Sequence, residues 1–183
     1  MENYTKYQLK SNEELASLLE GKDNLYVIAC NKCFKEFDTI DEPDCDEFLK
    51  FAAEQGKTVT GSTKVDFLCN KMHTERKLQD LLPEGTENVI VISCGLGIQT
   101  VAELAGKPVY AASNSLNYRG HHGMALTKKS CDACAQCYLN ITGGVCPIVD
   151  CSKSLVNGQC GGAKNGKCEV DPNKDCAWEK IYQ

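Results

Sequence analysis

Cysteine content is the sequence feature that most constrains this chain. Thirteen of the 183 residues are cysteine, and eight of these lie between Cys131 and Cys176. That share is high for a chain of this length. An odd number also prevents all of them from pairing in disulfides within one chain. Cysteines in such numbers form disulfides, bind metal or do both, and the redox compartment decides between these uses.

The sequence predicts a reducing compartment. The first ten residues contain no apolar core of a signal peptide, and the longest nearly apolar run, residues 25–30, is far too short to span a bilayer. With 20 basic and 25 acidic residues the formal net charge is −5, so no basic surface for nucleic acid or for an anionic membrane is expected. We therefore expect a cytoplasmic protein without membrane insertion, whose cysteines serve metal binding rather than disulfides.

Residues 1–126 show the pattern of an α/β domain. Short apolar runs that suit strands alternate with segments of helical periodicity, which predicts βαβ units around a mainly parallel, Rossmann-like sheet with helices. A first helix is expected to begin at Ser11 or Asn12 and to end at Gly21. The other expected helices are 44–55, 73–82 and 98–105, and the expected strands are 25–29, 65–68, 89–92 and 108–111.

Residues 127–183 have a different character, and we expect them to form a separate cysteine-rich, loop-rich domain. Glycine turns such as Gly143-Gly144 and Asn157-Gly158 replace the periodic pattern, and few aliphatic residues are available for a core. Metal binding contributes folding energy directly, so it is the expected source of order here.

The spacing of the cysteines in this second part favours iron–sulfur clusters. Cys131, Cys134 and Cys137 are separated by two residues each, so that three thiolates can each bind a different iron of one cubane. Zinc sites more often use two separated pairs or include histidine, and zinc remains the alternative. Eight ligands predict two [4Fe–4S] clusters. The candidate ligands are Cys131, Cys134, Cys137, Cys146, Cys151, Cys160, Cys168 and Cys176.

A third metal site is predicted at the edge of the sheet. Cys30 and Cys33 follow the strand 25–29, Cys69 follows the expected strand 65–68, and Cys94 follows the strand 89–92. Because the carboxyl ends of parallel strands share one edge of a sheet, these four thiols can converge there on a [4Fe–4S] cluster or on zinc. The alternative is that each is a small buried apolar residue.

Three further features carry weaker expectations. Cys45, near the start of a helix, is expected to be an unligated thiol. Gly95-Leu96-Gly97 lies between a strand and a helix, but Thr100 and Asn117 replace the glycine and the acid of the dinucleotide fingerprint, so nucleotide binding is not expected. His121-His122 is expected to be an exposed loop pair, with a proton or metal role as the alternative.

One family shares the C-terminal pattern of cysteines and glycines. The segments 131–137, 142–148, 151–162, 166–170 and 176–178 resemble the methylenetetrahydrofolate reductase C-terminal domain family. The resemblance extends more loosely to Cys30, Cys33, Cys69 and to Cys94-Gly95-x-Gly97. In anaerobic acetogenic bacteria this domain occurs as a small iron–sulfur subunit beside a flavin-bearing reductase. By position, the resemblance implies that these twelve cysteines are cluster ligands.

The resemblance implies an electron-transfer subunit of an oxidoreductase. The folate-reducing subunit of the family is a TIM barrel that binds FMN or FAD, and such a barrel needs about 250 residues. We therefore expect the folate chemistry of the Wood–Ljungdahl pathway on a partner, with a ferredoxin or a further subunit as electron donor and no catalytic residues in this chain. The competing hypothesis is a zinc-stabilised structural module of a one-carbon or methyl-transfer complex.

Overall fold

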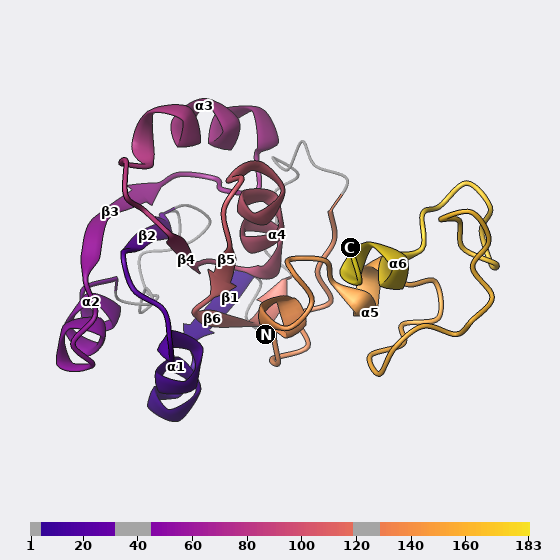
Figure 1. Ribbon diagram of the computed structural model, residues 1–183, viewed down its shortest axis with the longest axis horizontal. Helices are drawn as coiled ribbons and strands as arrows, with labels where there is room; N and C mark the ends of the chain where they lie inside the picture. The colour runs from indigo at the N-terminus through magenta and orange to yellow at the C-terminus, as the bar shows by residue number, and fades with distance from the viewer. Residues whose placement is uncertain (1–4, 32–44, 119–128) are drawn as a thin grey trace.

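The computed structural model describes residues 5–31, 45–118 and 129–183, which form an α/β part and a cysteine-rich part (Figure 1). The centre of the α/β part is a four-stranded parallel sheet in the order β3-β2-β4-β5. This confirms the predicted α/β class with a parallel sheet and helices. Its strands are β2 (Leu25–Cys30), β3 (Val59–Val65), β4 (Asn88–Ile92) and β5 (Val109–Ala111).

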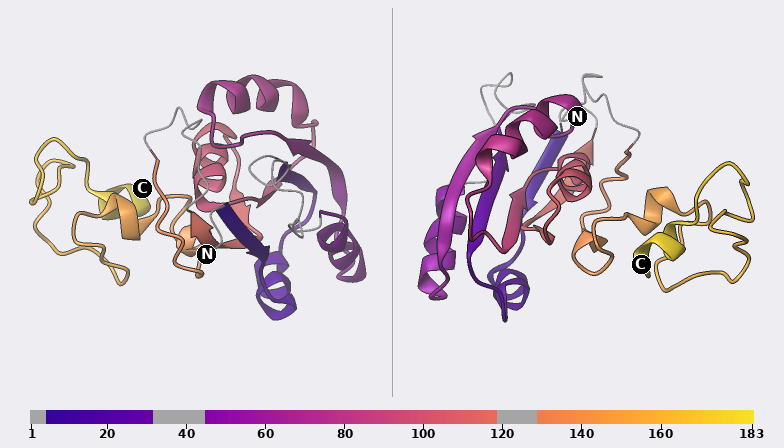
Figure 2. Two further views of the ribbon diagram at one scale, coloured as in Figure 1. Left: turned by 180° about the vertical axis from the view of Figure 1, so that it is seen from behind. Right: turned by 45° about the horizontal axis from the view of Figure 1, so that its top comes forward.

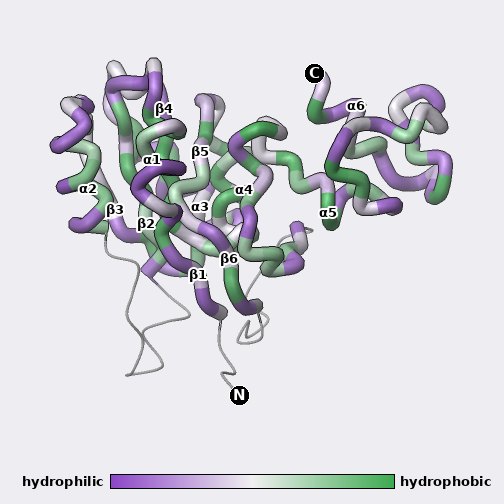
Figure 3. Tube along the Cα trace, turned by 90° about the horizontal axis from the view of Figure 1, so that it is seen from below, coloured by the Kyte–Doolittle hydropathy of each residue, from purple (hydrophilic) through white to green (hydrophobic). Residues whose placement is uncertain are grey.

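Helices cover both faces of this sheet. Val27 and Ile90 point into the core on the face that carries α1 (Asn12–Leu19) and α2 (Cys45–Glu54). Ile28 and Val91 point into the core on the opposite face, against α3 (Lys71–Leu81) and α4 (Gly95–Leu104). Because successive side chains of a strand alternate between faces, the central strands β2 and β4 must be apolar throughout. Figure 3 shows this as hydrophobic strands enclosed by helices with hydrophilic outer faces.

The order of the strands creates a crevice at one edge of the sheet. From β2 the chain passes through α2 to β3 on one side, and from β4 it passes through α4 to β5 on the other side. The direction of winding therefore changes between β2 and β4, which are neighbours. In open α/β sheets, ligands bind outside the carboxyl ends of the strands at such a switch point.

A second, two-stranded sheet was not predicted. β1 (Thr5–Leu9) pairs antiparallel with β6 (Ser113–Tyr118), directly after β5. The sequence of β6 is polar, so it carries no apolar strand signal, yet its first residues are buried. The Ser113 hydroxyl serves as hydrogen-bond partner for both backbone groups of Ser93. It accepts from the N–H of Ser93 (2.9 Å) and donates to the carbonyl of Ser93 (2.7 Å).

The predicted boundaries hold for most elements, with one clear error. The predicted strand 65–68 is wrong: β3 ends at Val65, and the chain then turns, with Phe67 at φ 51°. β3 lies at the edge of the sheet and is only half-buried, so its residues are mostly polar and gave no apolar pattern. The first helix begins at a capping box, in which the Ser11 hydroxyl accepts from the N–H of Glu14 and the Glu14 carboxylate accepts from the N–H of Ser11.

The cysteine-rich part contains little regular structure. Its elements are the 3₁₀ turn η1 (Tyr138–Asn140) and two short helices, α5 (Pro147–Asp150) and α6 (Ala177–Ile181). Residues beyond α5 extend away from the α/β part as irregular loops that return to α6 (Figure 2). Within the described ranges, no helix has the length and apolar character needed to cross a membrane.

Candidate metal centres

Three cysteines lie near one another at the crevice between β2 and β4, and we call them the sheet-edge set: Cys30, Cys69 and Cys94. Cys30 is the last residue of β2, Cys69 closes the turn after β3, and Cys94 precedes α4. Cys69 and Cys94 belong to one buried cluster, and Cys30 packs against it. The topology therefore brings these three candidate ligands together. The fourth, Cys33, lies outside the described residues, as does the pair His121-His122.

The environment of the sheet-edge set opposes ionisation of its thiols. Burial, with a smaller contribution from Cys30, raises the pKa of the Cys69 thiol to about 11. Burial and then Cys30 also raise the pKa of the Cys94 thiol, while the backbone N–H of Gly97 acts in the opposite direction. Metal binding requires thiolates, so a bound cation would have to supply the compensating charge.

Four of the C-terminal cysteines surround one hollow next to the α/β part. This middle set consists of Cys131, Cys134, Cys137 and Cys146. Gly95 and Gln99 of α4 and Ser115 of β6 complete the wall of the hollow. The eight cysteines from Cys131 to Cys176 all carry free thiols.

The middle set is held in place by the start of α4. A β-carbon at Gly95 would lie 2.7 Å from the Sγ atom of Cys131, so only glycine allows this thiol to approach. Gln99 donates through Nε2 to the carbonyl oxygens of Gly95 (3.0 Å) and Ser130 (2.7 Å), which fixes the chain just before Cys131. The glycines that resembled part of a nucleotide loop are thus fully buried, and Gly95 faces a cysteine.

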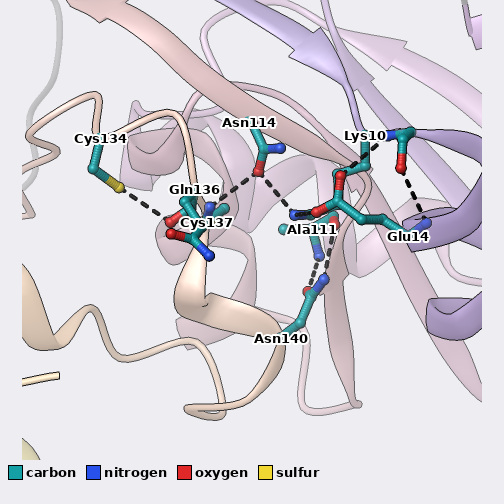
Figure 4. A network of polar contacts seen from close by, with 9 residues as sticks. Lys10, Glu14, Ala111, Asn114, Cys134, Gln136, Cys137 and Asn140 are labelled. Atoms are coloured by element: carbon teal, nitrogen blue, oxygen red, sulfur yellow. Dashed lines mark hydrogen bonds and ion pairs between the residues drawn. The ribbon is translucent and has the colours of Figure 1, made fainter. Parts of the chain in front are cut away.

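A polar network fastens η1 to the sheet (Figure 4). The side chain of Asn140 forms the two backbone hydrogen bonds that a neighbouring strand would otherwise form with Ala111. Its Oδ1 accepts from the N–H of Ala111 (2.5 Å), and its Nδ2 donates to the carbonyl of Ala111 (3.0 Å). The Oδ1 of Asn114 accepts from the N–H of Cys137 (3.0 Å) and from the ammonium of Lys10 (2.8 Å). Isolated polar residues carry no spacing signal, so a role for Lys10, Asn114 or Asn140 could not be predicted from the sequence.

The other four C-terminal cysteines surround a second hollow. This outer set consists of Cys151, Cys160, Cys168 and Cys176. Trp178 lies against the hollow and donates through Nε1 to the carbonyl of Leu155 (2.8 Å), so it connects α6 to the loop after α5. Gly144, which belongs to the segment before α5, lies instead against Ala102 of α4, with φ 84°. The two hollows share no cysteine.

The outer set is more polar than the middle set. Burial raises the pKa of Cys137 to about 11 in the middle set. In the outer set, a hydrogen bond with the Ser152 hydroxyl and the backbone N–H groups of Asp171 and Val170 lower the pKa of Cys168. Cys160 donates to the carboxylate of Glu169 (3.3 Å), which also pairs with Lys153. Thiolate is therefore easier to form at Cys168 than at Cys137.

Several candidate ligands share one backbone context. Each stands immediately before a helix, where the N–H groups of the first turn have no helical partner and favour a negatively charged sulfur. At Cys146, burial raises the pKa of the thiol, and the N–H groups of Val149 and Ile148 lower it. The cysteines in this position are Cys94, Cys137, Cys146 and Cys176.

The three sets follow one another through the molecule. Cys94 precedes Gly95, which Cys131 touches, so the sheet-edge and middle sets adjoin. Cys146 and Cys151 flank the two ends of α5, a single helical turn that separates the middle and outer sets. The rise of four or five helical residues is about 7 Å. In the described ranges no three Cys, His, Asp or Glu side chains are grouped as ligands of one metal ion.

Among the described cysteines, Cys45 is the one that lies outside these three sets. It begins α2 and is buried in the core with Phe48 and Ala52. This agrees with its expected position near a helix start.

The comparisons with known proteins concern the cysteine-rich part above all. Neither the curated proteins nor the solved structures contain a significant match to the chain. One family model does match, and it covers the last two residues of β5, all of β6 and both C-terminal cysteine sets. Residues 110–183 match the family described as methylene-tetrahydrofolate reductase C terminal, which confirms the predicted family resemblance over this part of the chain.

Proposed function

We propose that this chain is the iron–sulfur electron-transfer subunit of a methylenetetrahydrofolate reductase complex. The observation that carries the proposal is the division of the eight C-terminal cysteines into two separate groups of four, each around its own hollow. Four thiolates are the usual ligand set of a [4Fe–4S] cluster, and the family match links this region to an oxidoreductase.

The residues of both sets suit such a ligand. Thiols that surround a hollow can each bind a different iron, whereas the thiols of a zinc site meet at one ion, about 2.3 Å from it. Gly95 has no side chain, so it leaves room beside Cys131. The N–H groups at the starts of the short helices carry partial positive charge, which favours a negatively charged group. A bound [4Fe–4S] cluster supplies one-electron transfer without a change in covalent bonds.

We further propose that Cys30, Cys33, Cys69 and Cys94 hold a third group, either [4Fe–4S] or zinc. Three of these thiols meet at the switch point of the sheet, where ligands of open α/β folds bind. The contact between Gly95 and Cys131 then places this site next to the middle set. With a cluster in each of the three sets, the chain would hold a series of redox sites from the sheet edge to the outer lobe.

The folate chemistry is assigned to a partner. The described residues form an open sheet rather than a barrel, and two of their hollows are lined by four cysteines each. We propose a TIM-barrel subunit with FMN or FAD, which adds two electrons and two protons to methylenetetrahydrofolate and yields methyltetrahydrofolate. The electrons come from a ferredoxin or a further electron-donor subunit, in the cytoplasm of an organism that uses the Wood–Ljungdahl pathway.

Metal analysis is the first test of this proposal. Protein prepared without oxygen should contain about eight irons and eight acid-labile sulfides from the two C-terminal sets, or about twelve of each if the sheet-edge set also binds a cluster. About eight irons with one zinc would assign zinc to the sheet-edge set. Protein that contains zinc and no iron would contradict electron transfer and would support the competing structural module.

A ligand variant tests the function itself. Cys134→Ser replaces a soft ligand of the middle set by a harder one, so its cluster should be lost or altered. The complex should still reduce methylenetetrahydrofolate when an artificial donor reduces the flavin directly, but it should slow by orders of magnitude when electrons enter through this chain. Equal rates in both assays, with the subunit ratio unchanged, would show that the middle set is outside the electron path.

A further inference from the structure

The α/β part places a buried positive charge beside the middle set. The side chain of Lys10 is only 6% exposed, although lysine is almost never buried without a partner. Its ammonium donates to Asn114 Oδ1 at 2.8 Å, and the same oxygen accepts from the backbone N–H of Cys137 at 3.0 Å. The charge is therefore within about 6 Å of the Cys137 nitrogen, with one amide oxygen between them.

Among the described residues, the carboxylate that pairs with Lys10 belongs to Glu14 and lies on the solvent side. Glu14 Oε1 lies 3.1 Å from the ammonium, and the Glu14 side chain is 48% exposed. Water therefore screens the carboxylate more strongly than it screens the ammonium, because the Lys10 side chain is buried. In this ion pair the ammonium of Lys10 lies nearer to Cys137 than the carboxylate of Glu14 does, as Figure 4 shows.

Neither the fold nor the cysteine spacing requires a charge at this position. An uncharged donor would satisfy Asn114 Oδ1 equally well. The reduction potential of an iron–sulfur cluster depends on the local net charge, because reduction adds one electron to a group that is already negative.

We infer that Lys10 is a positioning residue that raises the reduction potential of the middle set relative to a site without this charge. The inference rests on the proposed function, since it requires a cluster on Cys131, Cys134, Cys137 and Cys146. Its functional consequence is that the middle of the series of redox sites retains electrons better than it would without Lys10.

Potentiometric titration followed by electron paramagnetic resonance tests this inference. The measurement uses the full chain loaded with iron and sulfide without oxygen. The spectral component that disappears in Cys134→Ser identifies the middle set. Lys10→Met should retain the iron content and shift the midpoint of this component to a more negative potential, while the other components stay unchanged. Lys10→Arg, which keeps the charge, should restore most of the original potential.

Lys22→Met is the matched control. Lys22 lines the same surface hollow as Lys10, where its ammonium lies 4.7 Å from the centre of the Tyr110 ring. The two lysine-to-methionine variants have the same net charge, so the shift in Lys22→Met should be clearly smaller if the buried position of Lys10 matters. Equal shifts in both variants would overturn the inference.

A second variant keeps the inference testable if Lys10→Met does not bind its cluster. Glu14→Gln leaves Lys10 in place and removes the negative charge, so the same midpoint should move to a more positive potential. An unshifted midpoint in Glu14→Gln would overturn this inference but not the proposed function. The same holds for an unshifted midpoint in Lys10→Met at full iron content. A chain without iron would overturn the proposed function as well.

Discussion

The middle segment, residues 130–146, and the outer lobe, residues 147–183, carry four candidate ligands each but are stabilised differently. The middle segment is built onto the α/β part: Leu139 enters the core of one sheet face, and Asn140 pairs with β5. In the outer lobe, which is described in full, only Pro147, Ala177 and Trp178 are buried. Ion pairs such as Lys167–Asp175 lie on its surface.

This difference separates two roles of a metal site. In the middle segment, packing and hydrogen bonds place the cysteines, so a bound group finds a site that largely exists already. In the outer lobe the buried apolar area is too small to offset the conformational entropy of thirty-seven ordered residues. We propose that its order comes mainly from a bound metal group. We therefore expect the middle set to be a preformed site and the outer set to fold with its ligand.

Removal of iron should produce the largest difference between the two regions. After oxidative loss of iron or chelation, protease should cleave residues 147–183 within a time that leaves the described elements of the α/β part and residues 130–146 intact, because we expect only the outer lobe to depend on a bound group for its fold. Limited proteolysis with mass spectrometry of the fragments measures this. Simultaneous loss of the middle segment and the outer lobe would show that the contacts of α4 and β5 do not hold the middle segment without metal.

A pair of cysteine variants should separate the two sets. Cys168→Ser should remove about four irons and expose Trp178, the single tryptophan of the chain, because Trp178 lies against the outer hollow. Its emission should shift to longer wavelength. Cys134→Ser should also remove about four irons but leave this emission unchanged. Equal changes of the emission in both variants would indicate that the sets fold as one unit.

Loss of the Asn140 side chain should weaken the attachment of the middle segment. Asn140→Ala leaves the N–H and the carbonyl of the buried Ala111 without their partners. We expect a loss of about 1–3 kcal/mol in the free energy of unfolding of the α/β part. Denaturant unfolding followed by circular dichroism measures it. The control Asn157→Ala changes the same residue type at an exposed position of the outer lobe and should have almost no effect.

The smallest effect is expected at the ion pairs that connect the start of the middle segment to the helices. Glu103 of α4 lies 2.6 Å from Lys71 and 3.5 Å from Lys129. The hydrogen bond with Lys71, followed by the charge of Lys129, lowers the pKa of Glu103 below its ordinary value of 4.5. Glu103→Gln should cost less than about 1 kcal/mol at pH 7, because the pair is partly exposed.

The pH dependence of this variant follows from the sign of the shift. A lowered pKa in the folded state stabilises the protein above the unfolded-state value, and this contribution is lost as the pH falls from 4.5 through the lower folded-state value. The difference in stability between Glu103→Gln and the unmodified chain should therefore be constant at neutral pH and disappear in acid. A difference that grows as the pH falls would contradict the assigned ion pairs.

The candidate sites were predictable from the sequence to the extent that spacing and strand order determine them. Cys30 and Cys94 follow apolar strands, and the rule for parallel sheets was sufficient to bring them together with Cys69. The predicted strand before Cys69 was nevertheless wrong, because an edge strand of polar residues has no apolar period. As metal ligands, these cysteines and Cys33 remain a prediction.

The sequence by itself determined that this chain has an α/β part and a cysteine-rich part with too few apolar residues for a core, since periodicity and composition are local properties. Only the tertiary structure decided which cysteines share a hollow, because Cys146 and Cys151 are close in sequence and yet belong to different sets. It also decided that Lys10 lies beside Cys137. Contacts across more than a hundred residues depend on the folded sheet, and no local pattern encodes them.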